Sequence, residues 1–281
     1  MKDIKEYVDR YVLFGRPIPC HGVNIQPVKW SDVYLFNDAI KVFRIDKNRI
    51  PDIEIIQQTY LRFLLTLICS DEEDKERFLT ILSLCLGAKY NAKERNNEFE
   101  PNEVLVKHLP KEEQIFFING WNVYFHLFKT KCLLCIEYET GEVQLSDEQF
   151  DDIMKIILFQ NVFNYDDREM SEDFRRVVED YYKLKNKDII MPSPENKAMA
   201  VVTNSSYTLK ELEEVPLRLV ESMFDCIIDK TEYELDKLIV NQPNIEVKGF
   251  DLNHWIYKKK VDKYSEIFTD AQNLINKVTS I

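Results

Sequence analysis

The sequence predicts an α+β protein that is predominantly helical and carries a small antiparallel β patch. Only 6 of its 281 residues are glycine, about 2%, where roughly 7% is usual. Low glycine disfavours glycine-rich nucleotide loops and many-turned all-β folds, and it favours long helices. Apolar residues recur at helical spacing along most of the chain, whereas residues 115–145 alternate in short runs. We expect an N-terminal α+β part, residues 1–145, and a C-terminal helical part, residues 146–281.

Composition and charge narrow the functional classes. The chain is 45% hydrophobic, enough for a substantial core, and its formal net charge is −12. An acidic surface repels phosphate backbones, so we expect no nucleic-acid partner. The first residues do not read as a secretory signal, and no run of 18 apolar residues predicts a membrane span. We therefore expect a reduced protein in the cytoplasm.

The first elements of the N-terminal part follow from spacing and from proline. Residues 3–14 carry an apolar stripe at helical spacing. Val23 and Ile25 alternate with polar neighbours, which predicts a half-buried strand that Pro27 closes. Ser31 is the expected N-cap of the helix that follows.

The next two helices are predicted from a long apolar run and from its caps. Residues 55–69 are strongly apolar and predict one buried helix. Ser70 or Asp71 caps the following helix, whose first turn is acidic, as the helix dipole favours. Gly87 is the expected left-handed residue that ends it.

The β patch has three apolar runs and a shorter fourth, separated by turn dipeptides. Asn119-Gly120 and Thr140-Gly141 are the expected turns. The predicted strands are residues 115–118, 123–128 and 133–138, followed by alternation at Val143 and Leu145.

The C-terminal part reads as successive helices with clear start signals. Ser146 and Gln149 match a capping box, which predicts a helix to Asn161. The later helices begin near Ser171, at Pro194, after Thr208 and at Val215-Pro216, and the last of these runs to about Asn241. The pieces between Glu195 and Asp229 resemble a compact bundle that presents a groove.

The candidate chemical motifs favour structural roles. Cys132 and Cys135 form a CxxC pair in a strand-like run, which places the thiols on opposite faces and favours core cysteines over a metal or redox pair. Cys20-His21 lacks further ligands at metal-site spacing, and Ser205-Ser206 lacks a neighbouring base. We expect no catalytic residue, no metal and no cofactor.

Two pairs of acids leave one enzymatic alternative open. Asp151-Asp152 and Asp166-Asp167 lie at or near helix starts, where carboxylates interact with the dipole. If the two pairs converged, they could bind metal ions in a nuclease or hydrolase.

The C-terminal aromatic and basic run is the strongest candidate for partner binding. His254-Trp255-Ile256-Tyr257 precedes three lysines, a stripe too polar for a deep core and too aromatic for a solvated face. We expect it to dock on this protein or on a partner, so that truncation after Gly249 leaves residues 1–241 folded but weakens binding. The candidate partner-binding residues are Trp30, Trp255, Tyr257, Lys258, Lys259 and Lys260.

Three segments resemble tail-morphogenesis proteins of tailed bacteriophages. The pattern Pro17-Ile18, Gly22, Ile25, Pro27-Val28 and Asp32 resembles the start of tail assembly chaperones. Residues 195–229, ENKAMAVVTNSSYTLKELEEVPLRLVESMFDCIID, resemble a helical segment of phage tail proteins. Residues 254–271, HWIYKKKVDKYSEIFTDA, are similar to prophage-encoded proteins of Gram-positive bacteria.

The resemblance implies a binding role without catalysis. The expected partners are other tail proteins, a tape-measure or tube protein, in the cytoplasm of a bacterial host. The chain is longer than typical tail chaperones, and its β patch has no place in their pattern. A structural tail or baseplate subunit, present in the virion, is therefore an alternative.

Overall fold

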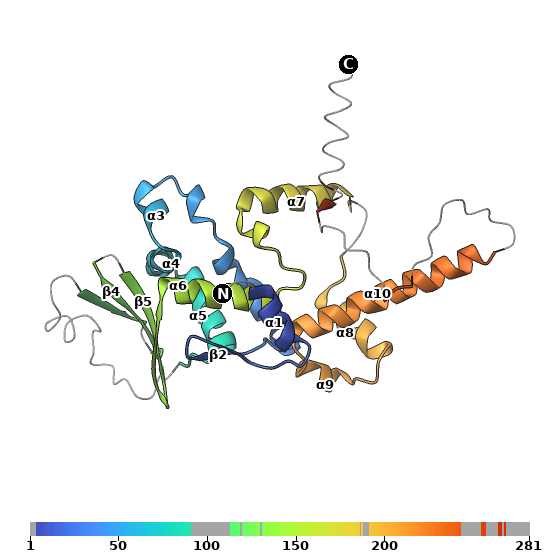
Figure 1. Ribbon diagram of the computed structural model, residues 1–281, viewed down its shortest axis with the longest axis horizontal. Helices are drawn as coiled ribbons and strands as arrows, with labels where there is room; N and C mark the ends of the chain where they lie inside the picture. The colour runs from blue at the N-terminus through green and yellow to red at the C-terminus, as the bar shows by residue number, and fades with distance from the viewer. Residues whose placement is uncertain are drawn as a thin grey trace, which may run out of the picture. The chain divides into compact units, whose positions relative to one another are not determined.

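The computed structural model has an α+β, helix-rich architecture, as the sequence predicts (Figure 1). It divides into two compact units: unit 1 contains Met1–Asp167 and Glu213–Leu219, and unit 2 contains Arg168–Leu212 and Val220–Ile281. The residues that the structure describes are 4–90, 113–118, 120–129, 131–185, 187, 191–242, 254–256, 264, 265 and 267.

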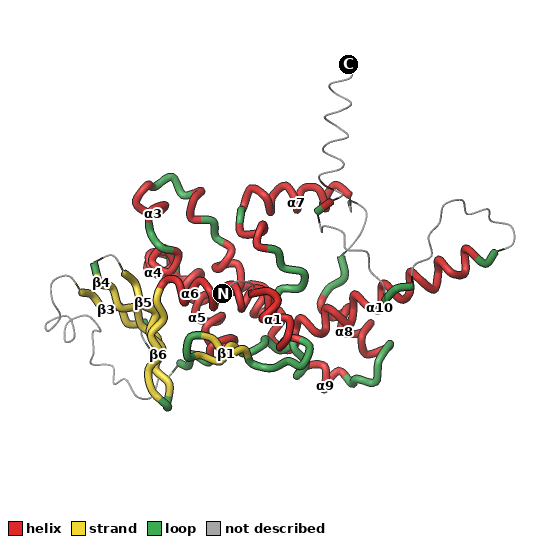
Figure 2. The backbone as a smooth tube through the Cα atoms, in the orientation of Figure 1, coloured by secondary structure: helices red, strands yellow, loops and turns green. Residues whose placement is uncertain are grey.

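Unit 1 combines six helices in its described part with two small sheets (Figure 2). The helices are α1 (Ile4–Val12), α2 (Val33–Ala39), α3 (Ile53–Gln57), α4 (Tyr60–Ser70), α5 (Glu72–Leu86) and α6 (Asp147–Asn161), with 3-10 turns at Trp30–Asp32, Ile40–Arg44 and Lys47–Arg49.

The larger sheet is a four-stranded antiparallel meander. Its strands are β3 (Glu113–Phe117), β4 (Val123–Phe128), β5 (Lys131–Tyr138) and β6 (Gly141–Ser146), in that order. Helices α4 and α6 pack against β5. Phe125 of β4 stacks on Phe78 of α5 at 5.9 Å, and Phe150 of α6 meets Phe43 edge-on at 5.8 Å. These aromatic contacts join the sheet to the helices in one core.

A short hairpin, β1 (Ile18–Cys20) and β2 (Val23–Ile25), confirms the predicted strand and adds its partner. His21 and Gly22 both have positive φ, 48° and 84°, as a two-residue hairpin turn requires. The backbone N–H of Gln26 donates to Cys85 at the end of α5, 2.7 Å away. The hairpin is thus attached to the helical layer.

The predicted helix caps can be compared with the observed ones. Asp71 caps α5, Gly87 ends it with a φ of 70°, and the Ser146–Gln149 capping box begins α6, all as predicted. The prediction that Ser31 caps α2 is wrong. The N-cap is Asp32, the last residue of the preceding 3-10 turn, and neither Ser31 nor Asp32 makes a side-chain capping bond to α2.

The single helix predicted over residues 55–69 is also wrong. It is two helices, because Gln58 and Thr59 take extended backbone conformations between α3 and α4. The Thr59 hydroxyl then accepts a bond from the N–H of Arg62 and starts α4 as its N-cap.

A segment far along the chain completes unit 1. The N–H of Trp30 donates to Val215 at 2.8 Å, and the N–H of Leu217 donates to Val28 at 2.8 Å. A β-carbon on Gly15, which has a φ of 57°, would lie 2.7 Å from the ring of Pro216. Helix α6 also packs within this unit, so the expected boundary at 145/146 falls inside unit 1.

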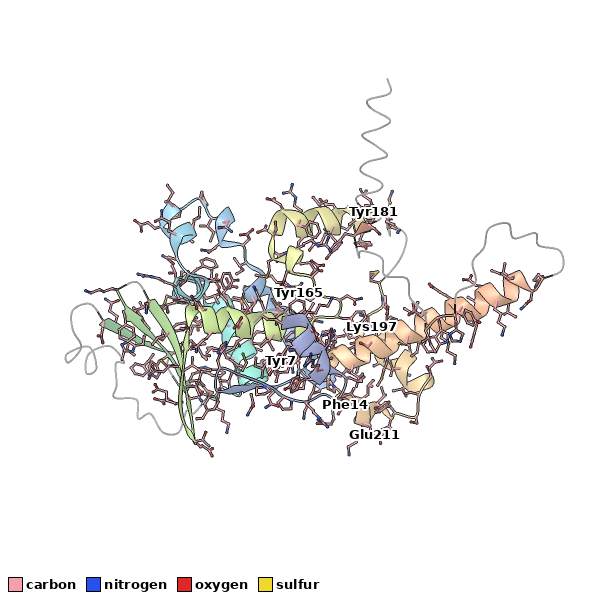
Figure 3. The ribbon with its side chains drawn as sticks, in the orientation of Figure 1. Tyr7, Phe14, Tyr165, Tyr181, Lys197 and Glu211 are labelled. Carbon is pink, nitrogen blue, oxygen red and sulfur yellow. The ribbon has the colours of Figure 1, made fainter. Side chains whose placement is uncertain are left out.

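Unit 2 is helical in its described part. Its elements are a 3-10 turn reaching Met170, α7 (Glu172–Lys185), α8 (Pro194–Thr203), most of α9 (Leu209–Glu213) and most of α10 (Leu217–Val240). Ser193 caps α8. Thr208 and Glu211, the latter labelled in Figure 3, form a reciprocal cap on α9. Lys197 of α8 pairs with Glu221 of α10 at 2.8 Å.

Candidate functional site

The candidate site that the structure favours is the second half of α10, where large aliphatic side chains remain exposed. They occur at positions i, i+7, i+10 and i+11, which lie on one helix face because a turn takes 3.6 residues. Their exposed fractions are 40% for Ile228, 55% for Leu235, 64% for Leu238 and 46% for Ile239. We call these four residues the α10 stripe.

The same helix face is covered nearer its start. Glu221 and Phe224 lie on the line of the α10 stripe one to two turns earlier. There, Lys197 of α8 bonds both oxygens of Glu221, at 2.9 and 2.8 Å, and its ammonium lies 5.8 Å from the ring of Phe224. The described helices of unit 2 therefore cover the first half of this face and leave the second half exposed.

The predicted C-terminal aromatic run meets α10 on its other side. The rings of His254 and Tyr233 are 5.0 Å apart, and Trp255 stacks on His254 at 5.9 Å. Trp255 is half-buried. Tyr257, Lys258, Lys259 and Lys260 lie outside the described residues. Docking on the protein's own body, one of the two expected outcomes, is therefore observed for His254.

Farther along, Tyr264 belongs to the core of unit 2. Its side chain is fully buried, with its ring 4.8 Å from Phe174 and 4.7 Å from the guanidinium of Arg168. Its hydroxyl donates to Glu169 at 2.6 Å. Because this side chain packs on α7 and on the turn before it, we now expect truncation after Gly249 to loosen α7 as well as to weaken partner binding.

Trp30, the other predicted partner-binding tryptophan, is buried. The residue is 7% exposed, and its backbone N–H donates to the carbonyl of Val215 in the segment that completes unit 1. This position gives Trp30 a packing role in the structure. The sequence did not distinguish it from an exposed tryptophan, since burial depends on tertiary packing.

The two acid pairs are separated along the chain: Asp151-Asp152 lie within the first half of α6, and Asp166-Asp167 lie beyond its end. Asp152, near its start, bonds the imidazole of His21 at 2.9 Å, and burial raises the pKa of the Asp151 carboxyl. Asp166 and Asp167 follow the end of the helix. In the described residues, no three His, Cys, Asp or Glu side chains gather closely enough to hold a metal ion.

The contact between Asp152 and His21 brings a thiol near a carboxylate–imidazole pair. Cys20, beside His21, is buried, and burial together with the nearby Asp152 raises the pKa of its thiol to about 11. A nucleophilic cysteine needs the opposite shift, since the thiolate is the reactive form. The contact between His21 and Asp152 therefore has a structural role, joining the β1–β2 hairpin to α6.

The predicted orientation of Cys132 and Cys135 is observed. Both are fully buried in β5, three residues apart and so on opposite faces of the sheet. Burial raises the pKa of Cys132 to about 12 and that of Cys135 to about 11. These shifts suit core thiols.

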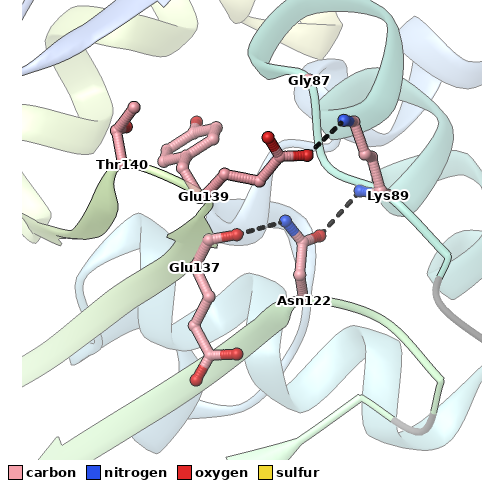
Figure 4. A pocket seen from close by; sticks show the side chains of 7 residues that line it. Gly87, Lys89, Asn122, Glu137, Glu139 and Thr140 are labelled. Carbon is pink, nitrogen blue, oxygen red and sulfur yellow. Dashed lines mark hydrogen bonds and ion pairs between the residues drawn. The ribbon is translucent and has the colours of Figure 1, made fainter. Parts of the chain in front are cut away.

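A polar cavity of about 540 Å³ lies where the β5–β6 turn meets the end of α5 (Figure 4). Asn122 crosses it, accepting from the Lys89 N–H at 2.6 Å and donating to the Glu137 carbonyl at 2.6 Å. Lys89 and Glu139 pair at 3.8 Å across the rim. The groups that line the cavity thus bond one another, and Asn122 joins the chain at Lys89, just after α5, to strand β5.

The comparisons with known proteins identify no relative: no family model, curated protein or solved structure matches this chain.

The α10 stripe was not predicted from the sequence, although its spacing is visible between residues 217 and 240. In a sequence, the same spacing describes a buried face equally well. Among the described helices, none is both long and apolar enough to cross a membrane.

Proposed function

We propose that this chain is a non-catalytic tail-morphogenesis protein of a bacteriophage or prophage, similar in role to tail assembly chaperones, and that it binds other tail proteins. The phage assignment rests on the resemblance of three segments, around Pro17–Asp32, Glu195–Asp229 and His254–Ala271. The binding role is supported by one structural observation, the α10 stripe. Exposed aliphatic side chains that share one helix face on a folded protein mark a candidate interaction surface.

The first experiment asks what the chain binds. The tagged full-length protein is expressed in a phage-producing host, and its partners are identified before and after particle assembly. The proposal expects a tape-measure or tube protein to co-purify with the chain, and expects the chain to be absent from mature particles. Its presence in mature particles would instead establish a structural tail or baseplate subunit.

A matched pair of variants links the binding to the surface. Leu235→Ser with Leu238→Ser removes the most exposed part of the stripe and should reduce partner capture at least tenfold. Lys237→Ala, on the opposite side of the same helix, is the control and should leave capture unchanged. Because all three side chains are exposed, neither variant should alter the fold, which circular dichroism checks.

The enzymatic alternative has its own test. A metal-dependent nuclease or hydrolase would use Asp151, Asp152, Asp166 and Asp167. If the pure protein hydrolysed nucleic acid with Mg²⁺ or Mn²⁺, and Asp151→Ala with Asp152→Ala abolished this, the non-catalytic role would be wrong. We expect no such activity, because Asp152 is bonded to His21 and the second pair follows the other end of α6.

A further inference from the structure

The charges on α10 are segregated around its exposed stripe. At about 100° per residue, Glu232 and Asp236 flank Leu235 on one side, at roughly 60° and 100°, and Glu234 flanks it on the other, at roughly 100°. Lys237 lies about 160° from Leu235, on the opposite side of the helix. Lys230, at about 140°, lies next to Glu234 and pairs with it at 3.9 Å, an exposed contact of the kind that contributes little. Any partner that covers the α10 stripe therefore meets carboxylates along both of its borders.

This charge pattern disfavours a second copy of the chain. In an antiparallel pair with Ile228 against Leu238 and Thr231 against Leu235, each border places like residues together, Glu232 against Glu232 and Glu234 against Glu234. A parallel pair places each of these glutamates against an isoleucine and provides no cation. Like charges at such positions select against self-pairing.

The same pattern disfavours a membrane surface. Helices that lie on lipid carry lysine and arginine beside their apolar face, because bilayer surfaces are commonly anionic. Here the residues that flank the stripe directly are Glu232, Glu234 and Asp236. Lys230 lies behind Glu234 and pairs with it, and Lys237 lies on the far side. The complementary occupant is a protein helix with basic borders.

Building on the proposed binding role, we propose that the second half of α10 binds an amphipathic helix of a partner protein, whose aliphatic face is bordered by lysine or arginine. Ile228, Leu235, Leu238 and Ile239 supply the apolar contact, as in other helix-to-helix recognition. Glu232, Glu234 and Asp236 select the charge of the partner. A basic residue of the partner takes the place of Lys230 at Glu234, and Lys237, on the far side of α10, takes no part.

The test uses two synthetic helical peptides with identical leucine positions, one bordered by lysine and the other by glutamate. Fluorescence anisotropy on the full-length chain should show that the lysine peptide binds at least tenfold more tightly. Added salt should reduce this difference, since the borders are solvent-exposed. Leu235→Ser with Leu238→Ser should remove binding of the lysine peptide.

Charge reversal provides the sharper control. Glu232→Lys with Glu234→Lys should invert the preference between the two peptides, whereas Lys237→Glu should leave it unchanged. Equal binding of both peptides, no binding of either, dissociation of a dimer by the leucine variant, or binding to anionic lipid vesicles would each overturn the inference.

These outcomes are separate from the test of the proposed function. A chain that captures a tail protein but does not discriminate between the peptides keeps its binding role and loses the charge selection. A chain that selects the lysine peptide but captures no tail protein has the binding surface without the phage role.

Discussion

At the scale of single residues, buried polar groups position the segments that are distant in sequence. Asn161, 1% exposed at the end of α6, accepts a hydrogen bond from the N–H of Val28 at 2.8 Å and donates to Ile157 at 3.0 Å. Val28 in turn accepts from Leu217. The Asn161 amide thus holds the chain after Pro27 against α6, and the Val28 carbonyl joins the same point to the segment that completes unit 1.

Asn161→Ala should therefore be strongly destabilising for a single substitution. It leaves the N–H of Val28 buried without its acceptor, a loss of about 1–3 kcal/mol in the free energy of unfolding. Urea unfolding measures it, with Gln144→Ala, on an exposed strand position, as the control at less than about 0.5 kcal/mol. Equal effects of the two variants would show that the bond is not important.

The buried thiols provide a second prediction at this scale. Because burial raises the pKa of Cys135 from 9.0 to about 11, its thiolate fraction at pH 8 should be about 100-fold lower than in the unfolded chain. Iodoacetamide at pH 8 should label the exposed Cys226 quickly and Cys132 and Cys135 only after unfolding. Mass spectrometry reads each site, and fast native labelling of Cys135 would contradict its burial.

The same shift gives these thiols a pH dependence of defined sign. The folded state keeps the proton to higher pH than the unfolded chain, so the contribution of Cys135 to stability is complete below about pH 9. It is lost as the pH rises from about 9 to 11. Stability that increased over this range through Cys135 would have the wrong sign.

Residue types alone were enough to predict some of these roles. The opposite orientation of Cys132 and Cys135 follows from the two-residue period of a strand and needs no tertiary information. Trp30 and the α10 stripe could not be sorted in this way, because exposure depends on what covers a side chain.

At the scale of elements, local signals predicted the boundaries wherever a side chain satisfied the helix end. Asp71, Gly87 and the Ser146–Gln149 box are correct because each bond closes within a few residues. The break between α3 and α4 was missed, although Gln57, Gln58 and Thr59 interrupt the apolar run there. The cap at Thr59 was the available signal.

The element most changed by the structure is the C-terminal segment. Tyr264→Ala should loosen α7, because the ring contacts of Phe174 and Arg168 and the bond to Glu169 are lost together. Hydrogen exchange should increase in residues 172–185 and remain unchanged in α6. The expected cost to unit 2 is about 3–5 kcal/mol, as for other buried aromatic truncations.

Tyr264→Phe separates packing from hydrogen bonding. It keeps the ring and removes only the hydroxyl, so the loss should be about 1–2 kcal/mol. Truncation after Gly249 should reproduce the alanine result in α7. Protection of α7 that survives both changes would return this segment to a peripheral role.

At the scale of the whole molecule, the chain composes its units from discontinuous pieces. Unit 1 includes Glu213–Leu219, although α7, α8 and nearly all of α9 come before this segment in the sequence and belong to unit 2. The expected boundary at residue 145 came from a change in pattern, from strands to helices, and such a change does not reveal which unit α6 packs in. Long-range pairing of this kind has no local signal.

A fragment of residues 1–167 should therefore fold less stably than unit 1 does in the full chain. It loses the burial of Val215 and Leu217, which are 8% and 4% exposed, and the bonds that their backbone makes to Trp30 and Val28. Burial of two aliphatic side chains contributes about 3–6 kcal/mol to the free energy of unfolding.

A synthetic peptide of residues 211–222 should restore part of this loss and raise the melting temperature of the fragment in a concentration-dependent way. The matched peptide with Val215→Asp and Leu217→Asp should not, because it places carboxylates where the segment is buried. If both peptides acted alike, or if the fragment alone were as stable as unit 1 in the full chain, the segment would be an accessory to unit 1 and not a part of its core.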